Sequence, residues 1–188
     1  MKNILITGGA GFIGSNLALQ LLQKGYTVTV LDNLLPQIHG DNPENTSPLY
    51  QSIKNKVQFI KGDVLHKKDW QQALKNQHIV VHFAAETGTG QSMYEIERYT
   101  NVNVSGTAIL LDYLTNESHH IEKVIVASSR AVYGEGKYFS EKKQTYFYPL
   151  DRKEADLQNG IFELRNPEDD TEFLNVVATD EQSKIQPK

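Results

Sequence analysis

The chain opens with the stretch Met1-Lys2-Asn3-Ile4-Leu5-Ile6-Thr7-Gly8-Gly9-Ala10-Gly11-Phe12-Ile13-Gly14. Residues 4–6 are typical of a buried strand, which leads into a glycine-rich turn and then a helix. Gly8 and Gly11 let the backbone approach a pyrophosphate closely, and the amino end of the helix offers N–H groups and a positive dipole end to that anion. Gly14 lets the helix pack tightly against the strand. The stretch therefore predicts a dinucleotide site.

The residues that follow support this prediction. We expect a helix over about residues 11–24, with Ile13, Leu17 and Leu21 on its buried face and Ser15, Asn16, Gln20 and Gln23 mostly opposite. A second strand, residues 27–31, ends at Asp32, where a carboxylate would bind the adenosine ribose hydroxyls and repel a 2′-phosphate. The predicted cofactor is therefore NAD rather than NADP. A P-loop is excluded because no Gly-Lys-Ser/Thr closes the turn.

Composition places the chain among ordinary globular proteins. Its 188 residues are 39% hydrophobic and 22% charged, and its net charge of −4 gives no electrostatic footprint for nucleic acid. Without cysteine, it can form neither disulfides nor a thiolate metal site. The six histidines show no ligand spacing, so we predict no metal. No apolar run is long enough to span a membrane and no signal peptide is evident, so we expect a cytoplasmic protein.

Strands and helices continue to alternate along the chain. Further strands are expected at residues 57–60, 78–83 and 124–127, with helices at 67–76 and 92–116 between them. This alternation predicts an α/β fold, a Rossmann-like doubly wound parallel sheet with helices on both faces. Residues 33–56 are expected to form a polar, flexible flap beside the cofactor site. The apolar surface of the helix at 92–116 predicts a homodimer through this helix.

Six motifs occur along the chain in a fixed order: Thr7–Ser15, Asp32-Asn33, Gly62-Asp63-Val64, His82-Phe83-Ala84-Ala85, Asn103–Thr107 and Ser128–Gly134. Together they resemble the extended short-chain dehydrogenase/reductase family, specifically its NAD-dependent nucleotide-sugar epimerases and dehydratases. The resemblance covers residues 1 to about 138. It implies a coenzyme site made of Gly8, Gly11, Phe12, Ile13 and Gly14 at the pyrophosphate, Asp32 and Asn33 at the ribose, Asp63 and Val64 at the adenine, and Phe83, Ala84, Ala85 and Asn103 along the cofactor wall.

The resemblance also makes Ser129 the catalytic serine. Independently of it, Ser129 follows a strand at the sheet edge where ligands of such folds bind, and its hydroxyl could hydrogen-bond a sugar hydroxyl that is being oxidised. The alternative is a serine that caps a loop. The Tyr-x-x-x-Lys pair that the family uses for hydride transfer is matched only by letter, at Tyr133/Lys137 and Tyr138/Lys142. Gly134 and Gly136 would break the helix that such a pair requires.

The expected organisation is a NAD-binding domain, residues 1–134, followed by a polar tail, residues 135–188. Relative to the family, the sheet is expected to be truncated at its C-terminal side. The tail resembles an insertion of some dTDP-deoxysugar epimerases in which cysteine pairs occur near the positions of Ser140, Asn166 and Asp169. We therefore expect the NAD-binding portion of a nucleotide-sugar 4-epimerase that is inactive alone. A 4,6-dehydratase fragment and a non-catalytic NAD(H)-binding module are the alternatives.

Overall fold

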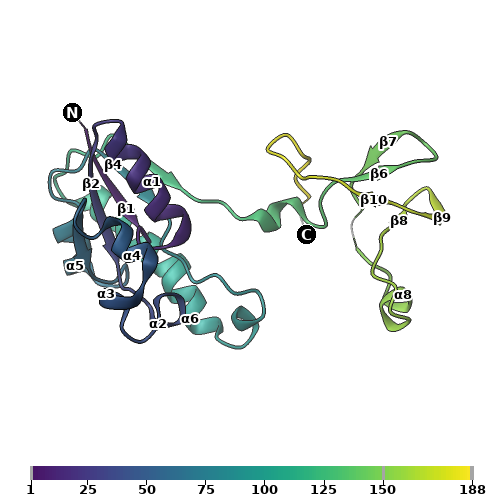
Figure 1. Cartoon of the computed structure of the whole chain (residues 1–188), viewed down its shortest axis with the longest axis horizontal. Coiled ribbons are helices and arrows are strands. Elements are labelled where there is room, and N and C mark those ends of the chain that lie inside the picture. Colours follow the sequence, from purple (N-terminus) through teal and green to yellow (C-terminus); the bar gives the residue numbers. More distant parts are fainter. Residues whose placement is uncertain (1, 150, 187–188) are drawn as a thin grey trace. The chain divides into compact units, whose positions relative to one another are not determined.

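The computed structural model describes residues 2–149 and 151–186, and the chain divides into two compact units, Met1–Ala127 and Ser128–Lys188. The first unit contains a five-stranded parallel sheet in the order β3-β2-β1-β4-β5 (Figure 1). Its strands are β1 (Asn3–Thr7), β2 (Thr27–Asp32), β3 (Gln58–Lys61), β4 (Ile79–His82) and β5 (Lys123–Val126). The predicted Rossmann-like parallel sheet is thus confirmed.

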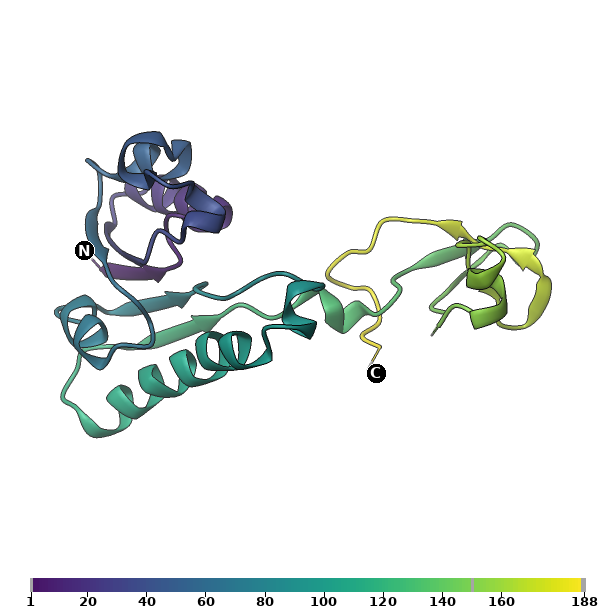
Figure 2. The same cartoon turned by 90° about the horizontal axis from the view of Figure 1, so that it is seen from below.

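Helices cover both faces of this sheet, as Figure 2 shows for the N-terminal helices on one side and the long later helix on the other. The helices are α1 (Phe12–Gln23), α2 (Pro36–His39), α3 (Pro43–Thr46), α4 (Pro48–Ile53), α5 (Lys67–Ala73), η1 (Gln91–Met93), α6 (Ile96–Thr100), η2 (Asn101–Ser105) and α7 (Gly106–Asn116). Within the described residues, no helix combines the length and the apolar character that crossing a membrane would require.

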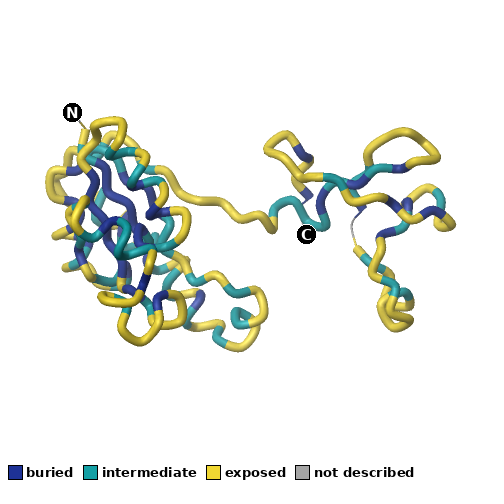
Figure 3. Tube along the Cα trace, viewed as in Figure 1, coloured by how far each residue is buried: buried dark blue, intermediate teal, exposed yellow. Residues whose placement is uncertain are grey.

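The central strands bury side chains on both faces. In β1, Ile4 and Ile6 belong to the core cluster under α1 and α4, whereas Leu5 belongs to the cluster under α5 and α7. The alternation follows from the two-residue period of a strand. Trp70 of α5 and Leu110 of α7 are fully buried in the second cluster. Figure 3 shows this concentration of buried residues along the sheet.

The face that α1 presents to the sheet differs from the predicted one. Its buried residues are Gly14, Ser15 and Ala18, whereas Ile13 is 67% exposed. The predictions that Ile13 is buried and that Ser15 lies opposite the core were wrong. Small side chains face the sheet because the helix starts immediately after the turn and lies close to it, so that a Cβ on Gly14 would come within 2.4 Å of the Gly8 carbonyl oxygen.

The segment predicted as a flap without regular structure contains three short helices. Each begins with proline, at Pro36, Pro43 and Pro48. Proline is well suited to the first helical position because its fixed φ matches the helix and its missing N–H has no partner there in any case. Ile53 then anchors α4 in the core below α1. The expectation of an irregular loop was therefore wrong for this segment.

The helix predicted over residues 92–116 is interrupted. A 3₁₀ turn, η1, is followed by a break before α6, and a π-helical segment, η2, joins α6 to α7. π-Helical turns accommodate an extra residue and often occur at functional sites. Here the wider turn contains Asn103, one of the predicted site residues.

The second unit is built from short strands. A three-stranded sheet in the order β10-β6-β7 contains β6 (Tyr138–Ser140), β7 (Thr145–Phe147) and β10 (Asn175–Val176), and a hairpin contains β8 (Arg165–Asn166) and β9 (Asp169–Phe173). The unit also has η3 (Arg130–Tyr133) and α8 (Glu154–Gln158). A loop-like tail was expected, so these strands correct that expectation.

A buried carboxylate connects the strands of the second unit. Glu172 of β9 is 6% exposed, and both of its oxygens lie 2.8 Å from the Ser140 hydroxyl, which donates to them. The Asn166 amide donates to Glu172 at 2.7 Å, and the Lys142 backbone N–H donates at 3.1 Å. Glu172 therefore links β6 to the β8–β9 hairpin at two of the positions where the resembling insertions carry cysteine.

Candidate coenzyme site

The turn between β1 and α1 requires glycine at two positions. Gly8 has φ +65°, and a Cβ there would lie 2.8 Å from the Ala84 backbone nitrogen. A Cβ on Gly14 would meet the Gly8 carbonyl. The Gly8 N–H donates to the Leu31 carbonyl at 2.9 Å, which fixes the turn against β2. Strand, turn and helix are therefore packed backbone against backbone, as the sequence predicted.

The amino end of α1 presents N–H groups to a ligand. Gly11 is the N-cap residue, no side chain makes a capping hydrogen bond there, and the first turn contains no acidic residue. The first N–H groups of a helix have no intrahelical acceptors and carry the positive end of the helix dipole. Phe12 and Ile13 are 75% and 67% exposed beside them. This end of α1 can accept an anionic group flanked by apolar surface.

Asp32 is positioned by backbone groups from two loops. Its Oδ2 accepts from the Ala10 N–H at 2.9 Å, and its Oδ1 accepts from the Leu34 N–H at 2.8 Å. A carboxylate has about four acceptor sites, so each oxygen retains one. Two acceptors side by side match the vicinal 2′- and 3′-hydroxyls of a ribose. The two backbone hydrogen bonds thus fix the orientation of the carboxylate.

Residues at the end of β3 lie beside the start of the flap. The Asn33 amide donates to Asp63 Oδ2 at 3.2 Å, which joins two of the predicted adenosine residues. Asp63 Oδ1 accepts from the Leu65 N–H at 2.9 Å. Val64 is buried, with its carbonyl bound to the Trp70 indole N–H at 2.7 Å. Its side chain packs in the core cluster with Trp70 and Leu110.

The residues after β4 form a wall next to the glycine turn. The Phe83 N–H donates to the Thr7 carbonyl at 3.1 Å, and the Ala84 N–H donates to the Thr7 hydroxyl at 3.1 Å. Phe83 and Ala84 are half-buried and Ala85 is exposed. The wall is therefore held in place by β1.

His82, at the end of β4, has a hydrogen-bond partner on each of its two ring nitrogens. Thr7 Oγ1 lies 2.7 Å from His82 Nδ1, and Thr107 Oγ1 lies 3.1 Å from His82 Nε2. Because the Thr107 hydroxyl donates to the Asn103 carbonyl at 3.0 Å, it accepts from Nε2–H, and Nδ1 accepts from Thr7. The ring is therefore the neutral Nε2–H tautomer. Burial lowers its pKa from 6.5 to about 4.

Asn103 holds the end of the wall. Its side-chain oxygen accepts from the Glu86 N–H at 2.8 Å, and its amide donates to the Glu86 carbonyl at 3.1 Å. This pair of bonds fixes the peptide groups on both sides of Glu86, directly after Ala85. Asn103, Thr107, His82 and Thr7 thus form a continuous chain of hydrogen bonds from α7 to β1 beneath the wall.

Ser129 lies in the second unit, as the N-cap of η3. Its hydroxyl accepts from the Ala131 N–H at 3.1 Å, and its side chain is exposed. The hydroxyl proton remains available for donation while the oxygen caps the turn. The capping alternative considered from sequence is therefore present in the structure, and it leaves the hydroxyl able to contact a ligand.

Neither Tyr-x-x-x-Lys match lies on one helix. Tyr133 ends η3, and Gly134 and Gly136, with φ +59° and +92°, follow before Lys137. Tyr138 and Lys142 lie at the two ends of a strand and turn, with Tyr138 6% exposed and Lys142 paired with Asp169 at 2.8 Å. Both matches are coincidences of spacing rather than catalytic pairs.

The comparisons with known proteins agree with this geometry. A family model described as the NAD dependent epimerase/dehydratase family matches residues 4–154. The chain belongs to this family. Its resemblance to the nucleotide-sugar epimerases, noted from six motifs, is thereby confirmed.

Two curated members of the family illustrate the extent of the similarity. The dTDP-L-rhamnose 4-epimerase of Burkholderia thailandensis is 38% identical over 159 residues, which are 84% of this chain and 42% of that protein. The UDP-glucose 4-epimerase of Mus musculus is 34% identical over 142 residues, 73% of this chain and 40% of that protein. The chain therefore spans about two fifths of the length of these relatives.

Solved structures give the same result. The UDP-glucose 4-epimerase of Bifidobacterium longum in complex with NAD+ and UDP matches with a TM-score of 0.57 at 32% identity, covering 71% of this chain and 38% of that one. The enzyme of Brucella ovis in complex with NAD matches with a TM-score of 0.56 at 34% identity, covering 71% and 38%. Both matched proteins contain the coenzyme that the family name specifies.

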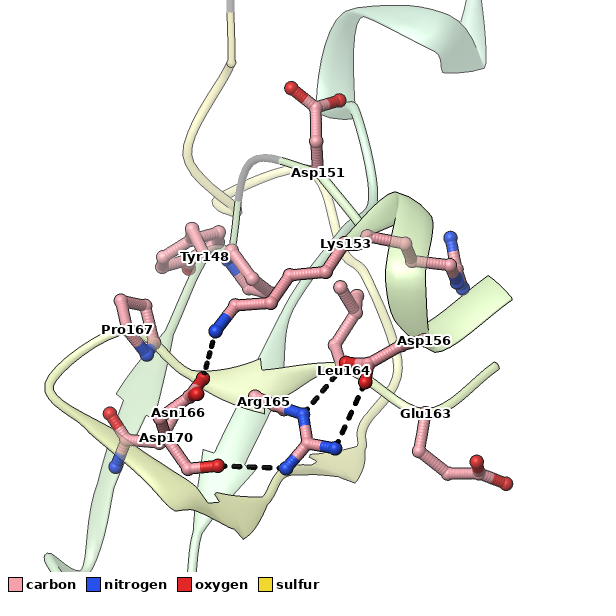
Figure 4. A pocket seen from close by; sticks show the side chains of 12 residues that line it. Tyr148, Asp151, Lys153, Asp156, Glu163, Leu164, Arg165, Asn166, Pro167 and Asp170 are labelled. Carbon is pink, nitrogen blue, oxygen red and sulfur yellow. Dashed lines mark hydrogen bonds and ion pairs between the residues drawn. The ribbon is translucent and has the colours of Figure 1, made fainter. Parts of the chain in front are cut away.

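A pocket of about 650 Å³ lies within the second unit of this family member, between Tyr148 and Asp170. Figure 4 shows that Lys153 and Arg165 of this pocket are engaged by acidic residues. Arg165 forms two hydrogen bonds with Asp156, at 2.7 and 3.0 Å, and Lys153 pairs with Asp170. Because these cations are already engaged, the pocket is a poor site for a nucleotide phosphate.

Proposed function

We propose that this chain is the NAD-binding part of a nucleotide-sugar 4-epimerase, which transiently oxidises the sugar at C4 and reduces it again. Both curated relatives described above are named as 4-epimerases, which favours this reaction over 4,6-dehydration. The match to the dTDP-L-rhamnose enzyme covers 84% of the chain, against 73% for the UDP-glucose enzyme. This difference supports a dTDP-deoxysugar as the substrate of the longer protein.

The observation that carries the proposal is the geometry of Asp32. Its two remaining acceptors suit the ribose hydroxyls of NAD, and its charge disfavours the 2′-phosphate of NADP. The rest of the site follows: Gly8, Gly11, Phe12, Ile13 and Gly14 hold the pyrophosphate, Asn33, Asp63 and Val64 the adenosine half, and Phe83, Ala84, Ala85 and Asn103 the wall beside the coenzyme.

In this proposal Ser129 hydrogen-bonds the sugar hydroxyl at C4. When bound, NAD supplies the acceptor and donor for the hydride. Proton removal requires a base whose pKa is tuned to the task. Neither Tyr133 nor Tyr138 has the helical lysine partner that would provide it. The chain is therefore expected to bind the coenzyme without catalysing epimerisation by itself.

Calorimetric titration of the purified chain with NAD and with NADP tests the proposal. We expect saturable binding of NAD and markedly weaker binding of NADP, because Asp32 repels the extra phosphate. The same preparation with NAD and dTDP-L-rhamnose should yield no epimer. Equal affinity for the two coenzymes would contradict the role of Asp32, and turnover would contradict the proposed inactivity.

We also propose a homodimer through the helical face formed by Ile96, Val104 and Leu111. These side chains are 66%, 63% and 53% exposed, although they lie on α6, η2 and α7, whose other sides are packed.

Light scattering tests this dimer and should give twice the 21.2 kDa chain mass. Leu111→Lys should give the monomer mass, because it would bury an unpaired charge. Asn116→Lys, at an exposed position of α7 that is five residues from Leu111 and so on a different face, is the matched control. A monomeric wild-type chain at micromolar concentration would contradict the dimer.

A further inference from the structure

Two loops on either side of the glycine-rich turn are tied to each other by side chains. α2 follows β2 and η1 follows β4, and β1 lies between these two strands in the sheet. Because the strands are parallel, both loops leave the sheet at the same edge as the turn after β1. A contact between α2 and η1 therefore crosses from one side of the proposed coenzyme groove to the other.

This contact is a reciprocal pair of amide hydrogen bonds. The Gln37 amide nitrogen donates to Gln91 Oε1 at 2.9 Å, and the Gln91 amide nitrogen donates to Gln37 Oε1 at 3.3 Å. We call these two residues the clasp. Gln37 is exposed and Gln91 is half-buried, so the pair can separate without opening the core.

The η1 side of the clasp is anchored to the coenzyme wall. Gln91 also accepts from the Tyr99 hydroxyl at 3.1 Å and donates to Glu95 at 2.7 Å. Arg98 donates to Glu95 at 2.7 Å and to Glu86 at 2.9 Å. Glu86 is the residue whose peptide Asn103 binds. The clasp is thus connected to the end of the wall.

The α2 side is anchored to the ribose-binding carboxylate. His39, 7% exposed, lies with Nδ1 at 2.9 Å from the Ser47 hydroxyl and Nε2 at 3.9 Å from Asp32 Oδ1. Ser47 in turn accepts from the Tyr50 N–H as the N-cap of α4. The four-residue helix α2 therefore holds Gln37 at a fixed distance from Asp32.

We propose that the clasp spans the coenzyme groove and must open for NAD to enter or leave. Gln37 and Gln91 are positioning residues in this inference, which rests on the proposed NAD site. Because the hydrogen-bonded pair must separate before NAD can pass in either direction, it resists entrance and release alike. Breaking it should accelerate both rates and leave the dissociation constant nearly unchanged. A residue that contacts NAD directly would instead alter the dissociation constant.

Stopped-flow fluorescence with NADH tests this inference. Gln37→Ala should raise the association and dissociation rates roughly five- to tenfold, as expected for the net loss of one to two weak hydrogen bonds. Gln91→Ala should raise them less, because Arg98 still donates to Gln37 at 3.4 Å. The double variant should equal Gln37→Ala, because that substitution already removes both the amide pair and the hydrogen bond from Arg98 to Gln37. Gln20→Ala, on the exposed side of α1, is the matched control and should match the wild type.

The absence of cysteine allows a second measurement. In a Gln37→Cys/Gln91→Cys variant, a short bis-maleimide crosslinker should trap bound NADH and block loading of the empty protein. Three results would overturn the clasp alone. They are wild-type association and dissociation rates in the alanine variants, an altered affinity for NADH without an altered association rate, and free exchange of NADH after crosslinking. Failure of the wild-type chain to bind NADH would overturn the proposed function and the clasp with it.

Discussion

At the scale of single residues, the site depends on backbone groups that fix side chains before a ligand arrives. Asp32 receives one N–H from the glycine-rich turn and another from the start of the flap. His82 connects β1 to α7 through two threonine hydroxyls. Preorganisation of this kind removes part of the ordering cost that binding otherwise incurs.

Alanine substitutions at Gly8 and Gly25 distinguish the energetic cost of close packing from that of backbone strain. Gly8→Ala places a methyl group 2.8 Å from the Ala84 nitrogen at a positive φ, so we expect a loss of roughly 3 kcal/mol in the free energy of unfolding. Gly25 has φ +82° but open space around it, and Gly25→Ala should cost only about 1 kcal/mol. Urea denaturation measures both. Equal losses would mean that the turn is not tightly packed against the wall.

His82 makes stability depend on pH. Its native pKa of about 4 lies below the ordinary value of 6.5, so the unfolded chain binds a proton first as the pH falls. The native state therefore loses up to about 3 kcal/mol between pH 6.5 and 4. Urea denaturation at pH 7.5 and 5 should show this loss, and His82→Gln should reduce it. His120→Gln, at an exposed position, should not reduce it.

The sequence alone was sufficient to place Gly8 and Asp32 at the carboxyl ends of strands, because each strand is recognisable from its own residues. It was not sufficient to predict the hydrogen-bond partners of His82 and Gln37. Thr107 and Gln91 lie 25 and 54 positions away, and no local period links them. Ile13 was misplaced because α1 starts so close to the sheet that the small residues Gly14, Ser15 and Ala18 face it, which leaves Ile13 exposed.

At the scale of elements, the strands and α1 were predicted to within about two residues, whereas the flap and the segment before α7 were not. Proline-initiated helices in the flap are too short to show a period. The π-helical segment η2 keeps an unbroken helical pattern in the sequence while shifting the register at Asn103. In the second unit, strands of two to five residues depend on a buried polar contact rather than on an apolar pattern.

Glu172 should be essential to the second unit. Glu172→Ala leaves the buried Ser140 hydroxyl and Asn166 amide without their acceptor, so the unfolding midpoint of this unit should fall. Hydrogen bonds from Asn166, the Lys142 backbone and Ser140 lower the pKa of this carboxyl, so acid should destabilise the wild-type unit as Glu172 becomes protonated. Amide hydrogen exchange across β6 and β9 measures both effects. Exposed Glu168→Ala is the control; equal exchange in the two variants would show that Glu172 carries no such link.

At the scale of the whole molecule, the parallel sheet brings together residues from three loops to make one coenzyme site. The carboxyl ends of β1, β2 and β4 supply the glycine turn, the ribose carboxylate and the wall. A doubly wound sheet places ligands at such an edge because the helices diverge there. In the proposed function, residues scattered between positions 8 and 103 would therefore contact one NAD molecule.

The most direct test of this account is a fluorescence titration with NADH of the wild-type chain, Asp32→Ala and Asp112→Ala. Asp112 pairs with Lys67 on the surface at 2.8 Å and serves as the matched carboxylate. We predict that Asp32→Ala weakens binding roughly 10- to 100-fold, as expected for lost hydrogen bonds to a charged group, and that Asp112→Ala binds like the wild type. Equal affinity of the Asp32 variant and the wild-type chain for NADH would contradict the coenzyme site described here.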